Sequence, residues 1–269
     1  MTTLDPTTVH RLPIATETLA ESGQTNTYLI EGSEPLLLDP AGRDSTIDSA
    51  IETCRPAHIT ATHCHPDHIA GVSAYAFETN ATVWSCIGHE NRFAQSTGVY
   101  PARTFSDDDT VGPARVIETP GHAVDHTAFE VDLADGRRAI FCGDLVVTDG
   151  SVVVGGPDAD MAAYLDSLSR LRAREPDLLY PGHGPVINEP DAEIDRLIAH
   201  RQNREKRILE ALSAGAEEIR EIVDRAYDKD ISSVYSLAEK TVIAHVEKLA
   251  SEGRVRWDCE TEQVTRLER

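Results

Sequence analysis

The segment 63–68, with the sequence HCHPDH, places four side chains that commonly bind metal ions within six residues. His63 and His65 follow a β-rich run and stand two positions apart, so their side chains leave the same face of the chain. The proline after His65 keeps that residue extended, and the chain then turns into a helix whose first turn presents Asp67 and His68. The pattern therefore directs four potential ligands at one small volume, and a solvated polar loop is the less favoured alternative.

Three further turns place a glycine before a ligand-type residue, each directly after a β-rich run. They are Pro120-Gly121-His122, Cys142-Gly143-Asp144 and Pro181-Gly182-His183. Glycine permits a tight turn that aims the next side chain along the rim formed by the strand ends. A lone histidine in such a place is more often a surface or capping residue, but three such turns beside the first motif predict a shared metal site. Imidazoles and carboxylates without thiolates suit zinc, with iron or manganese as alternatives.

The order of β-rich and helical patterns predicts two units, at 1–190 and 191–269. The first alternates short strands with helices, as expected for a layered α/β domain. Its strands are expected at 27–30, 35–38, 58–62, 81–85, 114–118, 127–131, 138–141 and 178–180, and its helices at 46–54, 67–77 and 159–173. The second has helical spacing of apolar residues at 194–212, 219–227 and 237–249, followed by a hairpin of 254–257 and 263–267. Three helices and a terminal hairpin predict a small winged-helix domain.

The stretch 62–71, followed by the three glycine turns, resembles the ligand motifs of the metallo-β-lactamase superfamily in the same order. The resemblance covers about residues 14–190 and implies a four-layer αβ/βα sandwich with two metal ions. It implies a first ion held by His63, His65 and His122, a second held by Asp67, His68 and His183, and Asp144 as a bridge between them. An early family aspartate matches Asp39, which is expected to support the site from behind.

Two metal ions about 3.5 to 4 Å apart can share a water molecule and lower its pKa toward about 7. A bridging hydroxide is therefore the expected nucleophile. Asp67 is the expected proton acceptor that then protonates the leaving group, with a role as a ligand alone as the alternative. His126 is expected to orient a ligand or to contact substrate. The remaining histidines are expected to be structural or surface residues: His10, His58, His89, His200 and His245.

Residues 155–161, 179–187 and the helix 200–209 are similar to the lactamase-β-like branch of that superfamily, which includes endoribonucleases that act on single-stranded RNA and carry a C-terminal winged helix. The resemblance implies a phosphodiesterase. The charge balance argues against it, because 46 acidic and 25 basic residues give a net charge of −21, which repels phosphate backbones. Helix 237–249 mixes two lysines with two glutamates, so it carries no basic stripe, and a winged helix that packs against protein is favoured.

Two other functions remain open. A small-ester, thioester or lactone hydrolase of the glyoxalase II type would satisfy the same THxHxDHxxG pattern at 62–71, although the C-terminal helices that hold glutathione in glyoxalase II have no counterpart. A winged-helix regulator with a structural metal domain is the non-enzymatic alternative. It is less favoured, because structural zinc sites are closed by four ligands, usually including cysteine, whereas a carboxylate-bridged pair leaves room for water.

Composition predicts the compartment. The first ten residues lack a secretory leader, and five scattered cysteines without a CxxC pair indicate reduced thiols, so a cytoplasmic protein is expected. No run approaches the roughly 20 apolar residues of a membrane span, so no membrane partner is expected. Only four of the 25 basic residues are lysines. Together with the acidic excess, this favours a protein adapted to the salt-rich cytoplasm of a halophilic archaeon over an ordinary acidic protein. The oligomeric state cannot be read from the sequence.

Overall fold

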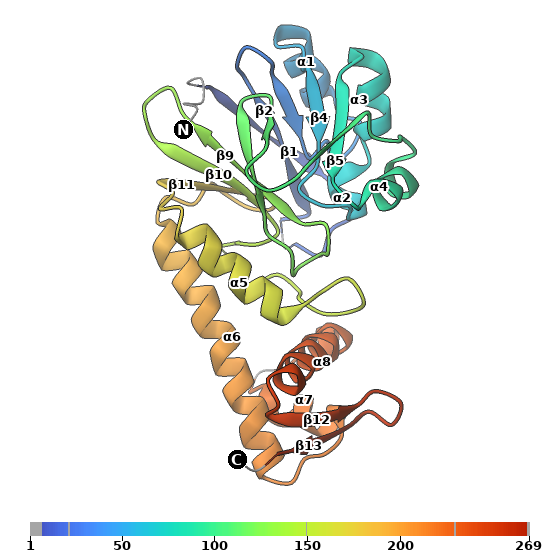
Figure 1. Ribbon diagram of the computed structural model, residues 1–269, viewed down its shortest axis with the longest axis vertical. Coiled ribbons are helices and arrows are strands. Elements are labelled where there is room, and N and C mark those ends of the chain that lie inside the picture. Colours follow the sequence, from blue (N-terminus) through green and yellow to red (C-terminus); the bar gives the residue numbers. More distant parts are fainter. Residues whose placement is uncertain (1–6, 21, 149, 229, 268–269) are drawn as a thin grey trace.

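Two mixed β-sheets face each other in the computed structural model, which describes residues 7–20, 22–148, 150–228 and 230–267 (Figure 1). Within these residues the first sheet has six strands in sequence order, with β1–β2 and β2–β3 antiparallel and the later pairs parallel. The strands are β1 (Val9–Ala15), β2 (Gln24–Ile30), β3 (Leu36–Leu38), β4 (His58–Thr60), β5 (Thr82–Cys86) and β6 (Arg103–Phe105).

The second sheet has five strands among the described residues, in the order β11-β10-β9-β8-β7, and only β10 and β11 are parallel. They are β7 (Thr110–Val111), β8 (Ala114–Glu118), β9 (Thr127–Asp132), β10 (Arg138–Gly143) and β11 (Leu178–Pro181). The helices of this part of the chain cover the outer faces of the two sheets. They are α1 (Ser45–Thr53), α2 (Pro66–Ile69), α3 (Val72–Thr79), α4 (Glu90–Thr97) and α5 (Met161–Arg172).

Alternation along the strands explains the layers. In β2, Tyr28 and Ile30 point between the sheets and join one apolar cluster with Phe129 of the second sheet, whereas Leu29 points outward to the cluster under α1 and α3. On the far side of the second sheet, Ile140 packs against Leu168 of α5. Side chains on alternate positions of a strand face opposite sides, so each sheet needs two apolar partners. The result is helix, sheet, sheet, helix, as the sequence predicts.

The helix expected at 67–77 is in fact two helices, α2 and α3, so that prediction was wrong. Gly71 lies at the break, and its N–H donates to the carbonyl oxygen of Pro40 at 2.8 Å instead of continuing the helical ladder. A Cβ atom on Gly71 would lie 2.8 Å from the carbonyl oxygens of both Pro40 and Gly42. The break therefore brings the loop after β3 against the loop that carries the histidines.

Three strands and one helix were not predicted: β1, β6, β7 and α4. In β1 only Leu12 and Ile14 are buried, and Pro13 lies between them, so the strand has little apolar alternation. Proline cannot donate to a sheet ladder, which argues against a central strand but is acceptable here because β1 is an edge strand. The strands β6 and β7 span three and two residues, too few for a periodic signal.

The C-terminal unit begins on α6 (Pro190–Ser213), a long helix that descends from the sandwich (Figure 1). It continues through α7 (Ile219–Ala226), the short 3-10 turn η1 (Ser232–Val234), α8 (Tyr235–Ser251) and the antiparallel hairpin of β12 (Val255–Asp258) and β13 (Gln263–Arg266). Its apolar core unites α6, α7, α8 and both hairpin strands. The expected three helices and hairpin are therefore present, while a domain boundary at 190 stays a prediction.

Helix α8 packs against the sandwich as well as against its own unit. Ala244 belongs to the apolar cluster of Tyr164 and Leu168 in α5. Arg201 of α6 is buried beside this contact, with its guanidinium 5.3 Å from the centre of the Tyr164 ring and one NH2 group donating to the carbonyl of Val152 at 2.5 Å. The two units therefore share a packed seam.

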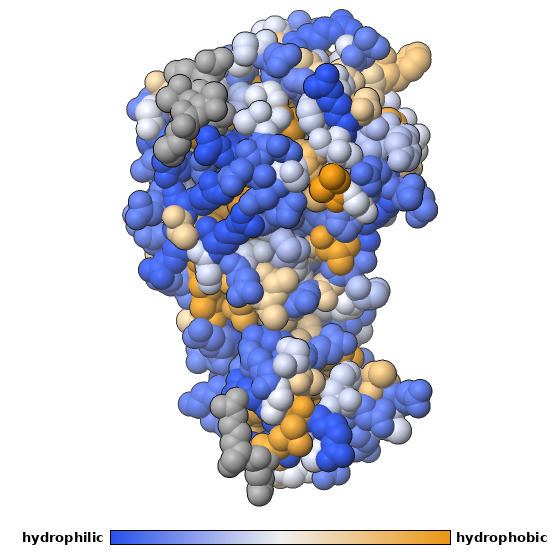
Figure 2. Space-filling model, viewed as in Figure 1, coloured by the Kyte–Doolittle hydropathy of each residue, from blue (hydrophilic) through white to orange (hydrophobic). Residues whose placement is uncertain are grey.

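Hydrophilic residues cover most of the molecular face in Figure 2, and hydrophobic residues appear there only in small patches. This agrees with the large excess of acidic residues. In the part of the chain that the structure describes, no helix combines the length and the apolar character needed to cross a bilayer.

His245 of α8 has no exposed surface, and neither ring nitrogen has a hydrogen-bond partner among the described residues. Burial, followed by the charges of Arg201 and Lys248, lowers its pKa to about 3. An unfolded histidine has a pKa of about 6.5, so below that pH the folded state binds fewer protons and loses stability as the pH falls. We expect His245→Leu to remove this loss, which amounts to about 2 kcal/mol between pH 6.5 and 5.

Urea unfolding of both proteins at pH 8 and pH 5 measures this effect. The variant should be at least as stable as the wild type at pH 8 and clearly more stable at pH 5. Gln202→Leu, at an exposed position of α6, is the control, because it introduces the same leucine without removing a titratable group and should not change the pH dependence. Equal pH profiles for the wild type and His245→Leu would contradict the expectation.

Candidate metal centre

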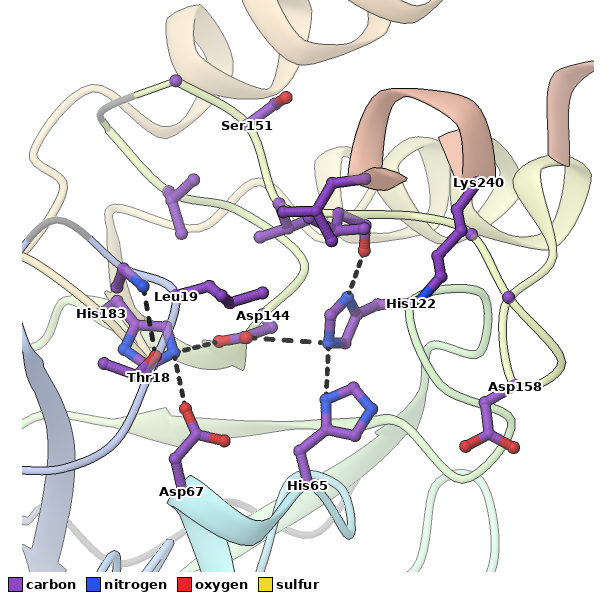
Figure 3. Close-up of a pocket in the computed structure, with 18 of the residues that line it drawn as sticks. Thr18, Leu19, His65, Asp67, His122, Asp144, Ser151, Asp158, His183 and Lys240 are labelled. Atoms are coloured by element: carbon purple, nitrogen blue, oxygen red, sulfur yellow. Dashed lines mark hydrogen bonds and ion pairs between the residues drawn. The ribbon is translucent and has the colours of Figure 1, made fainter. Parts of the chain in front are cut away.

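The potential ligands lie on four loops that follow strands of both sheets. The segment 63–68 follows β4, His122 lies between β8 and β9, and Asp144 and His183 follow β10 and β11. Gly143 pairs with Pro181 across the parallel strands β10 and β11, so the last two ligands lie at the same sheet edge. The strand ends therefore bring residues that are up to 120 positions apart to one place (Figure 3).

All seven residues predicted as metal ligands come together. They form three overlapping groups, and within each group the potential ligand atoms lie within 4.8 Å of one another. The groups are His63, His65 and His122; His63, His68 and Asp144; and Asp67, His68 and His183. None of the five histidines expected to be structural or surface residues belongs to such a group within the described ranges.

Three imidazole rings are oriented through Nδ1. In each, this nitrogen lies against an oxygen acceptor, so Nδ1 carries the proton and Nε2 keeps a lone pair. The pairs are His68 with Asp39 Oδ2 at 3.0 Å, His122 with the Val153 carbonyl at 2.9 Å, and His183 with the Gln24 carbonyl at 2.8 Å. Each Nε2 lone pair therefore remains available to a cation.

His63 and His65 supply the remaining imidazole nitrogens. The Thr62 hydroxyl donates to Asp39 Oδ2 at 2.9 Å and can therefore accept from His63 Nδ1 at 3.1 Å, which leaves a lone pair on His63 Nε2. That Nε2 lies 2.8 Å from His65 Nδ1, which lies 3.0 Å from His122 Nε2. Burial lowers the pKa of His63 well below its ordinary value and that of His65 to about 4. Three neutral rings thus converge on one point, an arrangement that a metal ion satisfies.

The second half of the cluster centres on Asp144. Its Oδ1 lies 3.4 Å from His68 Nε2 and 3.3 Å from His183 Nε2, yet Oδ1 and His68 Nε2 are both buried without a hydrogen-bond partner among the described residues. Burial alone would raise the pKa of Asp144, but the neighbouring imidazoles of His68 and His183 hold it well below the usual range. Asp67 Oδ2 lies 3.6 Å from the same His183 nitrogen. An ionised carboxylate among unpartnered imidazole nitrogens fits a metal ion, so the donor set suits two ions.

Asp39 supports the cluster, as its early position predicts. It is fully buried, and it accepts from the Thr62 N–H at 2.6 Å, from the Thr62 hydroxyl and from His68 Nδ1. Its backbone is left-handed, with φ of 51°, which turns the carboxylate back toward the strand end of β4. One side chain therefore sets the orientation of both His63 and His68.

We expect Asp39→Asn to weaken metal binding by about ten- to a hundredfold, the usual cost of losing a partner that orients a ligand. Thr62 and His68 both donate hydrogen bonds to the carboxylate. In the amide, an N–H₂ group would face one of them, so a donor would meet a donor and that hydrogen bond would be lost. Competition with a chromogenic chelator measures the affinity. Asp135→Asn, at an exposed aspartate paired with Arg137, is the control. An unchanged affinity in Asp39→Asn would contradict the supporting role.

His126 lies beneath the cluster. Its Nε2 accepts from the N–H of Asp144 at 3.2 Å, so the proton is on Nδ1 and donates to the Thr119 hydroxyl at 2.9 Å. Burial lowers the pKa of His126 to about 3, which keeps the ring neutral. Of its two expected roles, the structure shows the first, because His126 fixes the backbone of a potential ligand and does not line the cavity within the described residues.

A cavity of about 580 Å³ opens above the cluster. His65, Asp67, His122, Asp144 and His183 line its floor. The walls come from residues 17–20 and 22, from residues 147–148, 150–153 and 155–158, and from helix α8 through Leu237 and Lys240. No local signal in the sequence points to the walls, since α8 lies more than 90 positions beyond Asp144 and reaches the cavity only through the packing of the two units.

An ion-pair network holds the cavity loop in place. Arg92 of α4 makes two hydrogen bonds to Asp158, at 2.8 and 2.9 Å, and its Nε lies 3.2 Å from buried Asp125. Asp158 lines the cavity and Asp125 belongs to the loop after His122, so Arg92 connects that loop to the cavity wall. Sequence reasoning missed this pair, because nothing in either local segment distinguishes it.

Comparison with known proteins agrees with this geometry. Residues 20–183 match the family described as the Metallo-beta-lactamase superfamily, and residues 219–261 match the Beta-lactamase associated winged helix domain. The chain is 28% identical over 254 residues to the Beta-lactamase-like protein 2 homolog of Drosophila melanogaster, which covers 86% of this chain and 84% of that protein. It is 27% identical over 254 residues to the Atrochrysone carboxyl ACP thioesterase of Passalora fulva, over 89% of this chain and 74% of that protein.

A crystal structure of a metallo-beta-lactamase family protein from Thermus thermophilus superposes with a TM-score of 0.76 at 21% identity, over 96% of this chain and 98% of that one. This likeness shows the fold. Together with the two family matches, it confirms the predicted sandwich with its C-terminal winged helix.

Proposed function

Since this chain belongs to the metallo-beta-lactamase superfamily and is a hydrolase, we propose that it cleaves carboxylic ester or thioester bonds at a two-metal centre. The observation that carries the proposal is the set of seven converging ligands on the floor of a cavity of about 580 Å³. A cavity of this size suits a small molecule or the end of an acyl chain. The products would be a carboxylate and a free alcohol or thiol.

The ligand groups suggest how two ions would be held. We assign one ion to His63, His65 and His122, the other to Asp67, His68 and His183, and Asp144 to both. Zinc is proposed from the nitrogen and carboxylate donors, with iron and manganese as alternatives. Bound there, the ions would lower the pKa of a shared water and polarise the substrate carbonyl.

Asp67 is proposed to accept a proton from the attacking water and to pass it to the leaving oxygen or sulfur. Its carboxylate lines the cavity and lies on the first turn of α2, opposite Asp144 (Figure 3). A proton carrier must reach both the nucleophile and the leaving group, and a carboxylate at the cavity floor meets that requirement. Asp67 Oδ2 lies 3.6 Å from His183 Nε2.

The cavity favours a carboxylic substrate over single-stranded RNA. Proteins that bind single strands use a positively charged groove with aromatic platforms. Here Glu17 and Asp158 line the mouth, and Lys240 is the only lysine or arginine among the described lining residues. The name of the thioesterase relative from Passalora fulva points the same way. Single-stranded RNA, the substrate that the sequence resemblance implies first, is kept as an arm of the test.

A parallel assay of the metal-loaded protein tests the proposal. The substrates are a p-nitrophenyl ester, an S-acyl thioester, a lactone, bis(p-nitrophenyl) phosphate and single-stranded RNA, each at low and molar KCl. We expect the carboxylic substrates to be hydrolysed faster than either phosphodiester, and activity to persist at molar KCl if the acidic surface is a salt adaptation. Cleavage of RNA or the phosphodiester alone would overturn the proposed substrate class.

A further inference from the structure

Lys240 of α8 brings a positive charge from the winged-helix unit to the cavity above the metal centre. Its side chain projects from α8 toward His122 (Figure 3). Lys240 is exposed and is one of only four lysines in a chain with a net charge of −21. No hydrogen bond or ion pair joins its ammonium group to any residue that the structure describes.

The position of Lys240 is fixed by close packing of α8 against the cavity loop. A Cβ atom on Gly155 would lie 2.5 Å from the carbonyl oxygen of Lys240 and 2.9 Å from its Cβ, so the two backbones touch at this point. Further along α8, Ala244 is buried in the cluster of Tyr164 and α5. The buried Arg201 secures the same seam through the carbonyl of Val152. Because α8 is packed at Lys240 and again at Ala244, the side chain of Lys240 is presented to the cavity by packed structure.

Three of the four carboxylates among the described residues that line the cavity already face a partner. Asp67 and Asp144 face the imidazoles of the metal centre, and Asp158 makes two hydrogen bonds to Arg92. Glu17 is exposed at the mouth. Lys240, the one lysine or arginine among the described lining residues, is therefore the favourable place for a negatively charged group of a ligand.

Apolar side chains line the cavity together with Lys240. Leu237, one turn before Lys240 on α8, lines the cavity, as do Val152 and Leu19, and Leu19 is 78% exposed. A short hydrocarbon chain could cover these side chains while the carbonyl of the scissile bond lies at the floor. Burying such a chain would add about 25 cal/mol per Å² of apolar surface, which favours a linker over a fully polar ligand.

We propose that Lys240 binds a carboxylate or phosphate on the leaving side or acyl side of the substrate, so that the enzyme selects anionic esters or thioesters with a short apolar linker. The inference rests on the proposed function and deepens it. It also gives the winged-helix unit a role in the active site. Helix α8 supplies the one lysine or arginine among the described residues that line the cavity, whereas the sandwich contributes none. The substrate class is recognised by one negative group and one hydrolysable carbonyl at the two ends of the cavity.

Matched substrates separate this role from a structural one. We would compare S-acetyl derivatives of short ω-mercaptocarboxylic acids with the corresponding uncharged amides, and with the phosphate ester of S-acetyl-mercaptoethanol. In Lys240→Met the KM for the anionic substrates should rise by about ten- to a hundredfold, the usual value of a charge-assisted hydrogen bond. The kcat, and all constants for the amides, should change little. The carboxylate and phosphate arms show which anion is preferred.

Two further measurements keep the inference open to contradiction. Lys240→Arg should recover most of the affinity, and molar KCl should reduce the difference between wild type and Lys240→Met, because the Debye length then falls to about 3 Å. Lys206→Met, at an exposed lysine on α6, is the control. Equal losses on charged and uncharged substrates, or no loss on either, would overturn the role of Lys240. Failure of the wild type on every carboxylic substrate would instead overturn the proposed function, and the inference with it.

Discussion

The Asp144→Asn variant is expected to bind one metal ion instead of two and to hydrolyse substrate at least about a hundredfold more slowly. Losing a residue that only orients a ligand costs up to about a hundredfold, and Asp144 is assigned as a ligand itself. Asp144 Oδ1 lies between His68 Nε2 and His183 Nε2, and Oδ2 lies 3.7 Å from His122 Nε2. No other carboxylate in the described residues contacts both halves of the cluster. An amide keeps the shape but removes the negative charge that would hold two cations together.

Metal content by mass spectrometry and the rate of ester hydrolysis, measured on the same sample, test this expectation. Asp166→Asn, at an exposed position of α5, is the matched control and should keep both metal content and rate. Circular dichroism of the variant would show whether the fold is retained. Two equivalents of metal and a rate near that of the wild type in Asp144→Asn would contradict the assignment of Asp144 as the shared ligand.

The Gly121→Ala variant is expected to lose about 4 kcal/mol of folding stability, from about 1 to 3 kcal/mol of backbone strain and a similar amount of overpacking. Gly121 has φ of +134°, a conformation that residues with a Cβ rarely adopt. Its added Cβ would lie 2.2 Å from the backbone nitrogen of Tyr164 and 2.4 Å from its Cα. Both contacts are with backbone, so no rotation of a side chain can relieve them.

Since His122 is the next residue, the displacement should also weaken metal binding at the first ligand group. Denaturant unfolding and metal affinity are the two measurements. Gly136→Ala is the control, because Gly136 also has a positive φ, of 85°, but no atom lies within 4 Å of the added Cβ. It should lose only about 1 kcal/mol. Similar losses in the two variants would show that the contact between Gly121 and Tyr164 is not the cause.

The local parts of the metal centre could be predicted because they depend on neighbours in the chain. The strand at 58–60 is indicated by a short β-rich run that is buried throughout, and Pro66 marks the turn into the helix that follows. The glycine turns before His122, Asp144 and His183 are equally local. That these segments meet was implied by the resemblance to a family, since strand order across two sheets is not encoded in any one segment.

Features that depend on distant packing could not be predicted. The break at Gly71 arises from the carbonyl of Pro40, about thirty positions earlier. The role of His126 depends on the backbone of Asp144, and the pair of Arg92 and Asp158 spans 66 positions. Lys240 reaches the cavity only because α8 packs on the loop at Gly155. In each case the sequence shows the residue type but not its partner.

The winged-helix unit is thereby connected to the chemistry of the sandwich. Its core is separate, but α8 also contributes Ala244 to the core of α5 and Lys240 to the cavity. This arrangement agrees with the expectation, from its mixed charges, that the winged helix packs against protein. Recognition of a substrate by both units would couple the affinity for anionic substrates to the integrity of the seam at Arg201 and Tyr164.

Titration of metal into the chelator-stripped protein tests the central claim most directly, with hydrolysis of a p-nitrophenyl ester recorded at each addition. The seven converging ligands predict that the stripped protein is inactive, that activity saturates at two equivalents of zinc, and that Asp144→Asn saturates at one with little activity. Hydrolysis that survives complete metal removal, or full activity at a single equivalent, would contradict a two-metal hydrolytic centre.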